Sequence, residues 1–294
     1  MKIAFLGCAE TMPGSPTRRA DAFEHDHQIA ALRIGLAGSG VEAVDIDWRA
    51  PLEQLAQFRL ALLGTAWDYT DHPAEFLTQL EALESAGVAV CNSAEVVRWN
   101  ADKYYLEELA KAGAASIPTL WHDDPGAKEI HAAFDHFATD RVVVKRRVGA
   151  GALGQFSFIR GDPALIGWQM GHAAMIQPFL PAIQSEGEYS FVFIGGNFSH
   201  AILKQAANGD YRIQSLYGGR ETPIAPSLRD IDTAAAIMAM LPFTEPPLYA
   251  RIDMVRGLDG CMALIEAELI EPYLYPLQGP EFGKLLAEAV LARL

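Results

Sequence analysis

The sequence predicts an α/β front third followed by an α+β remainder. Over residues 1–95, short apolar runs alternate with segments of helical spacing, which is typical of a parallel sheet covered by helices. Beyond residue 175, paired apolar runs flank glycine-rich turns, which is typical of antiparallel hairpins. With 294 residues, the chain is long enough for two or three closely packed subdomains.

The front third is built from four short strands and two helices. The apolar runs predicted to be buried strands are residues 2–7, 41–47, 60–64 and 88–90. The apolar side chains at helical spacing are Ile29, Leu32 and Leu36 in the first helix, and Phe76, Leu80 and Leu83 in the second. Asp26 is the expected N-cap of the first helix.

The remainder starts with a short helix over residues 101–112 and a strand over 141–145. A loop with the glycines Gly149, Gly151 and Gly154 then leads to another predicted strand, 156–159. Two hairpin turns follow, at residues 195–197 and 257–260, and a last helix starts at residues 279–280.

Composition and net charge limit the kinds of partner that the chain is expected to bind. Apolar residues make up 50% of the chain and charged residues 20%, so we expect a sizeable core. The 23 basic and 37 acidic residues give a net charge of −14, which repels phosphate polymers and excludes nucleic acid as an expected partner. Cys8, Cys91 and Cys261 lack metal-site spacing and favour a reducing, cytoplasmic compartment. No apolar run reaches the roughly 20 residues that a membrane span needs, so no membrane partner is expected.

The second hairpin carries most of the predicted chemistry. Because side chains alternate along a strand, Arg251 and Asp253 share one face, and so do Glu266 and Glu268 on the return strand. If the glycines of the turn pair with each other, Arg251 lies opposite Glu266, with Asp253 and Glu268 as diagonal neighbours. Three such carboxylates resist ionising together unless a hard cation such as Mg²⁺ joins them. A solvated strand face with a salt bridge is the alternative interpretation.

Lys145 ends a strand and precedes the glycine loop. Glycines let backbone N–H groups approach an anion, and the ammonium adds a point charge, so the segment fits a flap over phosphates. It matches neither common nucleotide fingerprint, because its lysine precedes the glycines and a strand follows them. An ordinary hairpin explains the loop equally well. Taken alone, four further residues are explained as surface charge: Lys103, Glu188, Lys204 and Arg212.

These features occur in a recognisable order along the chain. The order is Lys103, Val144-Lys145 with the glycine loop, Gln177-Pro178-Phe179-Leu180, Glu188 to Val192, Arg251-Ile252-Asp253 and Glu266-Ala267-Glu268. It resembles the ATP-grasp superfamily, particularly the branch of bacterial glutathione synthetase and D-alanine–D-alanine ligase. Arg212 and the pair Gly218-Gly219 are similar to an arginine and paired glycines of glutathione synthetase. The resemblance covers about residues 92–275.

The resemblance implies a fold and a role for each residue. It implies an ATP-grasp fold after a Rossmann-like parallel α/β domain, divided into residues 1–95 (substrate domain), 96–175 (N-terminal lobe with the flap) and 176–294 (C-terminal lobe). The implied ATP-binding residues are Lys103, Lys145, Gly151, Gly154, the hinge residues Gln177, Phe179 and Leu180, and Glu188 on the ribose. The cations implied at the γ-phosphate and acyl phosphate are Lys204, Arg212 and Arg251. The implied ligands of one or two Mg²⁺ ions, with Mn²⁺ as the alternative metal, are Asp253, Glu266 and Glu268.

Two positions depart from the family pattern. Glu268 stands where the family usually has asparagine, which puts the number or preference of metal ions in doubt. Arg146 follows Lys145 where a proline is common, which puts the geometry of the loop in doubt.

The implied activity is that of a carboxylate–amine ligase that forms C–N bonds on a small amino-acid-like substrate, through an acyl phosphate and with release of ADP. We expect substrate contacts at Asp68 and Tyr69, past the third strand, and at Gly218 and Gly219. The Trp67-Asp68-Tyr69 pattern also resembles small ATP-grasp ligases of antibiotic pathways, which implies a ring closure of the cycloserine type.

Several alternatives stay open at this point. Residues 25–27, which are His25, Asp26 and His27, fit a base, a metal pair or a capped helix start, and the capped start is favoured. A protein-modifying amino-acid ligase and a non-catalytic nucleotide sensor are the competing functions. A homodimer is an expectation from the family alone.

Overall fold

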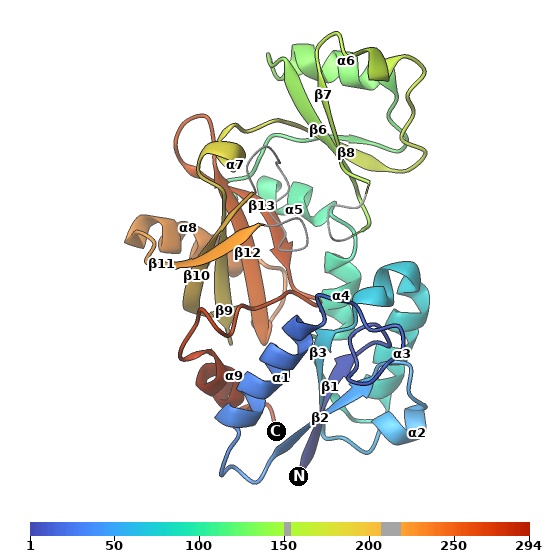
Figure 1. Ribbon diagram of the computed structural model, residues 1–294, viewed down its shortest axis with the longest axis vertical. Helices are drawn as coiled ribbons and strands as arrows, with labels where there is room; N and C mark the ends of the chain where they lie inside the picture. The colour runs from blue at the N-terminus through green and yellow to red at the C-terminus, as the bar shows by residue number, and fades with distance from the viewer. Residues whose placement is uncertain (150–153, 207–218) are drawn as a thin grey trace.

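The computed structural model describes residues 1–149, 154–206 and 219–294. These residues form three sheets, and Figure 1 shows both chain termini at the end of the molecule opposite to helix α6. The strands of the first sheet pair in parallel, whereas those of the other two pair antiparallel, which confirms the predicted fold class. Among the described helices, none has the length and apolar character needed to cross a membrane.

The first sheet has the strand order β2-β1-β3-β4. Its strands are β1 (Lys2–Gly7), β2 (Glu42–Asp47), β3 (Leu60–Thr65) and β4 (Ala89–Cys91). The helices of this part are α1 (Phe23–Gly35), α2 (Leu52–Leu55), α3 (Pro73–Ser85) and the 3-10 turn η1 (Trp67–Asp71). The apolar runs are buried as predicted, because helices cover the faces of a parallel sheet.

The second sheet has the order β5-β8-β6-β7 and lies at the far end of the molecule beside α6 (Figure 1). Its strands are β5 (Leu120–His122), β6 (Arg141–Arg146), β7 (Phe156–Ile159) and β8 (Ala174–Pro178). Its helical segments are α6 (Ala127–His136) and the 3-10 turn η2 (Pro163–Leu165). Strands β6 and β7 flank the glycine loop, as predicted.

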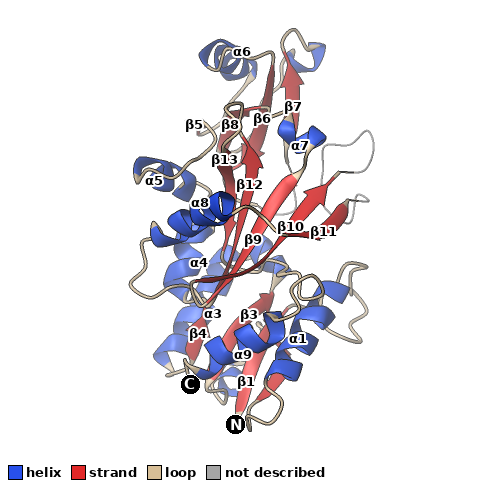
Figure 2. Cartoon of the chain, turned by 90° about the vertical axis from the view of Figure 1, so that its left-hand side faces the viewer, coloured by secondary structure: helices blue, strands red, loops and turns tan. Residues whose placement is uncertain are grey.

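The third sheet has the order β11-β10-β9-β12-β13, and Figure 2 shows its long central strands standing between the other two units. Its strands are β9 (Glu188–Ile194), β10 (Asn197–Gln205), β11 (Arg220–Ile224), β12 (Tyr249–Arg256) and β13 (Met262–Glu268). The helices of this part are α7 (Ala182–Ser185), α8 (Leu228–Ala239) and α9 (Phe282–Leu291). The predicted turn between β9 and β10 is confirmed, with positive φ at Gly195 and Gly196.

Two helix predictions were wrong in detail. Helix α1 begins before Asp26, so Asp26 is not its N-cap; its carboxylate pairs instead with Arg18 at 2.6 Å. The helix predicted over residues 101–112 begins later, as α5 (Tyr105–Lys111), and it is preceded by a helix that was not predicted, α4 (Ala94–Asn100). Lys103 therefore lies in the turn between two helices and not on a helix surface.

The predicted register of the β12–β13 hairpin was also wrong. Arg251 lies opposite Glu268, and Asp253 lies opposite Glu266. The turn is one residue longer than predicted, since Gly257 pairs with Cys261, and a bulge next to Glu266 adds one more residue. Because the two errors together shift the pairing by two residues, the acidic side chains still share one face.

Helix α9 packs across α1 at a close crossing (Figure 1). A Cβ placed on Gly35 would lie 2.0 Å from the carbonyl oxygen of Gly283, and one on Gly283 would lie 2.4 Å from that of Ala31. Only glycine lets the two backbones come this near. A segment from the end of the chain thereby fixes the helix that follows the first strand.

Candidate active site

One cavity of about 640 Å³ lies among the three sheets. Its walls include Glu24 and Tyr69 from the parallel unit, Lys145 from the second sheet, and Arg251 and Glu266 from the third. It opens at the carboxyl ends of the parallel strands, where ligands of open α/β sheets bind. Most of the predicted site residues that the structure describes therefore share one cavity, although the sequence places them in separate elements.

The end of the cavity between the second and third sheets is apolar. Ile117, Leu180, Val255 and Ile265 form a small buried cluster of their own there. At the predicted hinge, Gln177 donates from Nε2 to Thr119 Oγ1 at 2.9 Å. The N–H of Phe179 is already donated to the Arg141 carbonyl, and the Leu180 carbonyl accepts from the Ile183 N–H. Within the described chain, this leaves the N–H of Leu180 and the carbonyl of Phe179 to contact a base. This end suits a flat, largely apolar ligand group.

Two lysines stand beside this apolar end. Lys103 Nζ lies 2.8 Å from Glu266 Oε1 and donates to the Gly149 carbonyl at 2.6 Å. Burial acts to lower the pKa of Lys103, but Glu266 outweighs it and raises the pKa. Burial lowers the pKa of Lys145, and within the described parts of the chain no carboxylate forms an ion pair with it. An incoming anion such as a phosphate would supply the missing partner.

Asp253 is the most enclosed charge of the site, with 4% of its side chain exposed. Its carboxylate accepts hydrogen bonds from Ser190 Oγ at 2.5 Å, Lys204 Nζ at 3.2 Å and the guanidinium of Arg251 at 3.0 Å. Burial acts to raise the pKa of Asp253, but Arg251 and Lys204 hold it well below its usual range. Lys204 also pairs with Glu188, whose pKa burial raises to about 7.

Glu266 and Glu268 are more accessible than Asp253, with side chains 28% and 31% exposed. Glu268 pairs with Arg251, and burial together with Asp253 and Glu266 raises its pKa to about 7. Among the described residues, we find no group of three carboxylate, histidine or cysteine side chains that lie close enough together to hold a metal ion. The donor set nevertheless fits a hard divalent cation, because the partly exposed carboxylates of Glu266 and Glu268 lie on one face beside Asp253 and Mg²⁺ prefers oxygen ligands.

The end of the cavity next to the parallel unit is acidic. Glu24 projects from α1, and burial together with Glu221 of β11 raises its pKa to about 8. Glu271 also lines the cavity, and burial beside Glu268 raises its pKa. No cation forms an ion pair with Glu24 or Glu271 within the described ranges, whereas Asp21 is held by Arg19 at 2.7 Å. At this end Arg19 is already paired with Asp21, so Glu24 and Glu271 have no cation of their own within the described chain.

Sequence reasoning missed Glu221, Glu271 and Tyr273 as cavity residues. Glu271 had a usable signal, since it follows the strand that carries Glu266 and Glu268. Glu221 and Tyr273 had none, because only the tertiary fold brings them to the wall.

The two histidines of residues 25–27 contact different residues. His25 is buried and shares a 2.6 Å hydrogen bond with Thr65 Oγ1, while His27 contacts Tyr273 Oη at 3.0 Å. They form neither a metal pair nor a cap.

The predicted substrate residues differ in whether they line the cavity. Asp68 lines the cavity, but it accepts from Trp48 Nε1 at 2.8 Å and pairs with Arg49, so its oxygens are engaged within the parallel unit. Tyr69 lines the cavity with a buried ring. Gly219 is described and is not among the residues that line the cavity, while Gly151, Arg212 and Gly218 lie outside the described residues.

Of the flap residues, Gly154 has φ +70°, and a Cβ there would lie 2.5 Å from Arg146 Nε. Arg146 therefore packs against the base of the loop, at the position where the sequence departs from the family pattern.

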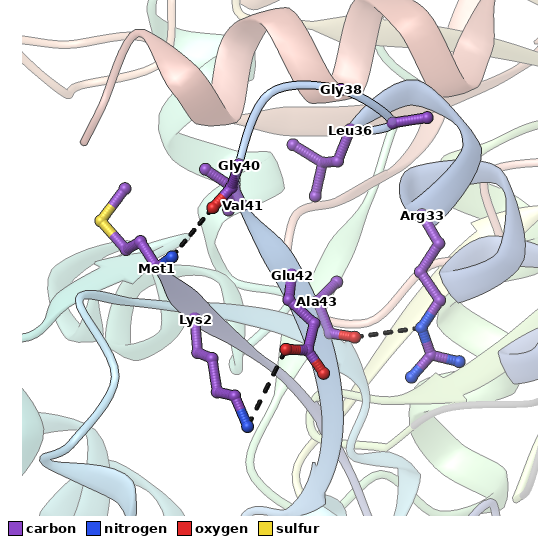
Figure 3. Close-up of a pocket in the computed structure, with 10 residues that line it drawn as sticks. Met1, Lys2, Arg33, Leu36, Gly38, Gly40, Val41, Glu42 and Ala43 are labelled. Carbon is purple, nitrogen blue, oxygen red and sulfur yellow. Dashed lines mark hydrogen bonds and ion pairs between the residues drawn. The ribbon is translucent and has the colours of Figure 1, made fainter.

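A second hollow, of about 580 Å³, lies at the opposite edge of the first sheet (Figure 3). Its polar groups bind one another: Lys2 pairs with Glu42 at 3.8 Å, and Arg33 donates to the Ala43 carbonyl at 3.0 Å. It lies at the amino ends of β1 and β2, far from the lysines and carboxylates, and it offers no convergent groups for chemistry.

The sequence of the chain is similar to proteins of D-cycloserine biosynthesis. Residues 3–92 match the family model of the N-terminal domain of D-cycloserine synthetase DcsG. The chain is 28% identical over 286 residues to the cycloserine biosynthesis protein DcsG of Streptomyces lavendulae, covering 92% of this chain and 94% of that protein.

Solved structures show the same fold over the whole chain. The crystal structure of D-cycloserine synthetase DcsG matches with a TM-score of 0.83 at 23% identity, covering 100% of this chain and 99% of that one. The D-alanine–D-alanine ligase of Bacillus anthracis complexed with ATP matches with a TM-score of 0.70 at 17% identity, covering 100% and 98%. The ATP-grasp ligase PsnB complexed with Mg and ADP matches with a TM-score of 0.65 at 15% identity, covering 99% and 97%. The chain therefore has the ATP-grasp fold behind a parallel α/β unit.

Proposed function

We propose, from the ATP-grasp fold and the cavity that it builds among its three sheets, that this chain is an ATP- and Mg²⁺-dependent carboxylate–amine ligase for a small amino-acid-like substrate. One observation carries the proposal: the cavity joins an apolar end with cations to an acidic end lined by the parallel unit. The similarity to D-cycloserine synthetase and to D-alanine–D-alanine ligase supports a small substrate.

The apolar end is the proposed nucleotide site. Adenine would lie against Leu180 and Ile265, with its phosphates directed toward Lys103 and Lys145. The partly exposed Glu266 and Glu268 would hold Mg²⁺, with Asp253 as a third ligand once it exchanges one of its hydrogen-bond donors. When bound, the metal supplies positive charge at the phosphate oxygens.

The reaction would proceed in two steps. A carboxylate oxygen of the substrate attacks the γ-phosphorus, the bond to the ADP oxygen breaks, and an acyl phosphate forms. Arg251 and Lys204, held in place by Asp253, would stabilise the charge that develops on the transferred group. An amine nitrogen then attacks the activated carbonyl carbon, and phosphate leaves as the amine loses a proton.

The acidic end is the proposed substrate site. Glu24 has a raised pKa and no cation paired with it in the described chain, so an ammonium group is its natural counter-ion. An amino acid bound with its ammonium at Glu24 would extend its carboxylate toward Arg251. The match of residues 3–92 to the D-cycloserine synthetase domain favours a substrate whose own nitrogen closes the ring.

A panel of amino acids with ATP and Mg²⁺, followed by phosphate release and product mass, tests the proposal. We expect ADP and phosphate only with an amino-acid-like substrate. A product lighter than one substrate molecule indicates ring closure, and a product that joins two molecules indicates intermolecular ligation. Stimulation by a polypeptide end alone would indicate a protein-modifying ligase. Binding of ATP without turnover for any panel member would indicate a sensor and overturn the proposal.

A further inference from the structure

Strand β13, which carries Glu266 and Glu268, is the outermost strand of its sheet. An edge strand has N–H and C=O groups that no neighbouring strand satisfies. Near its start, Leu264 donates its N–H to the Ala115 carbonyl at 2.7 Å. Further along, where the acidic residues lie, no strand continues this pairing within the described chain. The backbone between the two glutamates therefore needs other partners.

Two side chains supply those partners. The N–H of Ala267 donates to Tyr105 Oη at 2.9 Å, and that hydroxyl donates to the Ala267 carbonyl at 3.0 Å. Asn100 Nδ2 donates to the same carbonyl at 2.7 Å, and Asn100 Oδ1 accepts the N–H of Leu269 at 2.9 Å. This pattern fixes the amide orientation, because a flipped amide would set oxygen against carbonyl and N–H against N–H. Asn100 and Tyr105 thus replace a missing strand.

These contacts lie directly beside the acidic residues and Lys103. Ala267 lies between Glu266 and Glu268, so its backbone sets the spacing of the two carboxylates. Asn100 and Tyr105 flank the turn that holds Lys103, and Lys103 contacts Glu266 at 2.8 Å. Both side chains are buried, and their hydrogen bonds are shielded from water. The turn with the lysine and the strand with the acids are therefore held as one unit.

We infer that Asn100 and Tyr105 are positioning residues that hold Glu266 and Glu268 at the spacing needed to bind a divalent cation beside Lys103. The inference rests on the proposed function, in which these glutamates are metal ligands. Groups that orient metal ligands without touching the metal typically change metal affinity by about 10- to 100-fold when they are removed. A purely structural role would lower stability and leave metal affinity unchanged.

The test is Mn²⁺ binding to the full chain with a nonhydrolysable ATP analogue, measured from the electron paramagnetic resonance signal of free Mn²⁺. Tyr105→Phe removes one hydroxyl and keeps the ring. Tyr249→Phe is the matched control, since its equally buried hydroxyl donates to the carbonyls of Leu63 and Ile270 at 2.7 Å, beyond the glutamates. We expect Mn²⁺ affinity to fall about 10-fold or more in Tyr105→Phe and to stay within about twofold of wild type in Tyr249→Phe. The melting temperature should fall in both variants.

Asn100→Ala provides a second variant, and its loss of Mn²⁺ affinity should be at least as large, because it removes contacts at both Ala267 and Leu269. Equal Mn²⁺ affinity in wild type, Tyr105→Phe and Asn100→Ala would overturn this inference and leave the proposed function standing. Equal losses in Tyr105→Phe and Tyr249→Phe would also overturn it, since general loosening would then explain the effect. A wild-type chain that binds nucleotide but no Mn²⁺ would refute both proposals.

Discussion

The two ends of the cavity differ in how they are built. The end beside the second and third sheets is made from strands, and its groups are fixed by register: Lys145 lies near the end of β6, and Arg251 and Asp253 share a face of β12. The end beside the parallel unit is made mainly from a helix start and loops, with Glu221 of β11 beside them, and Glu24 and Glu271 come from distant parts of the chain. The first end is apolar and pairs its cations with carboxylates, while the second has an excess of carboxylates. Such a division would let one fold keep the proposed nucleotide site while the proposed substrate site varies.

Removing a charge from the strand-built end should have the largest effect. Lys145→Met keeps the length of the side chain and breaks no ion pair recorded in the described chain. We therefore expect stability to be retained while turnover falls by about 10²- to 10³-fold, as is typical when one stabilising group is lost from a transition state. Steady-state phosphate release and a thermal melt measure the two quantities. Unchanged turnover in a folded Lys145→Met variant would show that the phosphates bind elsewhere.

Removing a charge from the end beside the parallel unit should weaken substrate binding alone. Glu24→Gln removes the acid proposed to bind the substrate ammonium, and a charged hydrogen bond is worth about 1.5–3 kcal/mol. We expect KM for the amino acid to rise about 10- to 100-fold, with KM for ATP unchanged. Asp21→Asn is the matched control, because Arg19 already neutralises that acid. Equal effects of the two variants would contradict a specific role for Glu24.

Glu24 also predicts that KM for the amino acid depends on pH. Burial and Glu221 raise the pKa of Glu24 from 4.5 to about 8, so the free site is mostly protonated at pH 6 and ionised above pH 8. An ammonium ligand needs the ionised form, so KM should fall as pH rises toward 8, by up to about tenfold per unit. Saturating ATP and Mg²⁺ keep the other end of the cavity occupied during the titration. A slope that persists in Glu24→Gln would assign the titration to another group.

The smallest effect on activity is expected at Asp68, a predicted substrate residue. Asp68→Ala leaves the buried Trp48 Nε1 without its acceptor, and the free energy of unfolding should fall by about 1–3 kcal/mol. Because the oxygens of Asp68 are engaged by Trp48 and Arg49, KM for the substrate should stay within about twofold. Urea unfolding and steady-state kinetics measure both quantities. A large rise in KM would instead support direct contact of Asp68 with the substrate.

Strand patterns made one end of the cavity predictable from sequence. The predicted register of the β12–β13 hairpin was wrong, but its acidic side chains were still predicted to share one face. A shift of the pairing by an even number of residues leaves each side chain on the same face of the sheet. Asp26 failed as a helix cap because α1 already begins at Phe23, and the Asp26 carboxylate pairs with Arg18 instead. Asn100 and Tyr105 gave no signal at all, since their partners lie far along the chain and are backbone groups. Local spacing predicts which side chains share a face, but not what supports the backbone beneath them.

The crossing of α1 and α9 has a consequence for biosynthesis. The ribosome makes α1, the helix that bears Glu24, long before it makes the segment that clamps it at Gly35 and Gly283. A nascent chain that has completed its strands carries the strand-borne residues of the proposed nucleotide site, yet its proposed amino-acid site stays unanchored until α9 has emerged. Nucleotide recognition should thus mature first during translation and selectivity for the acceptor last, an order that stalled ribosome–nascent-chain complexes would reveal.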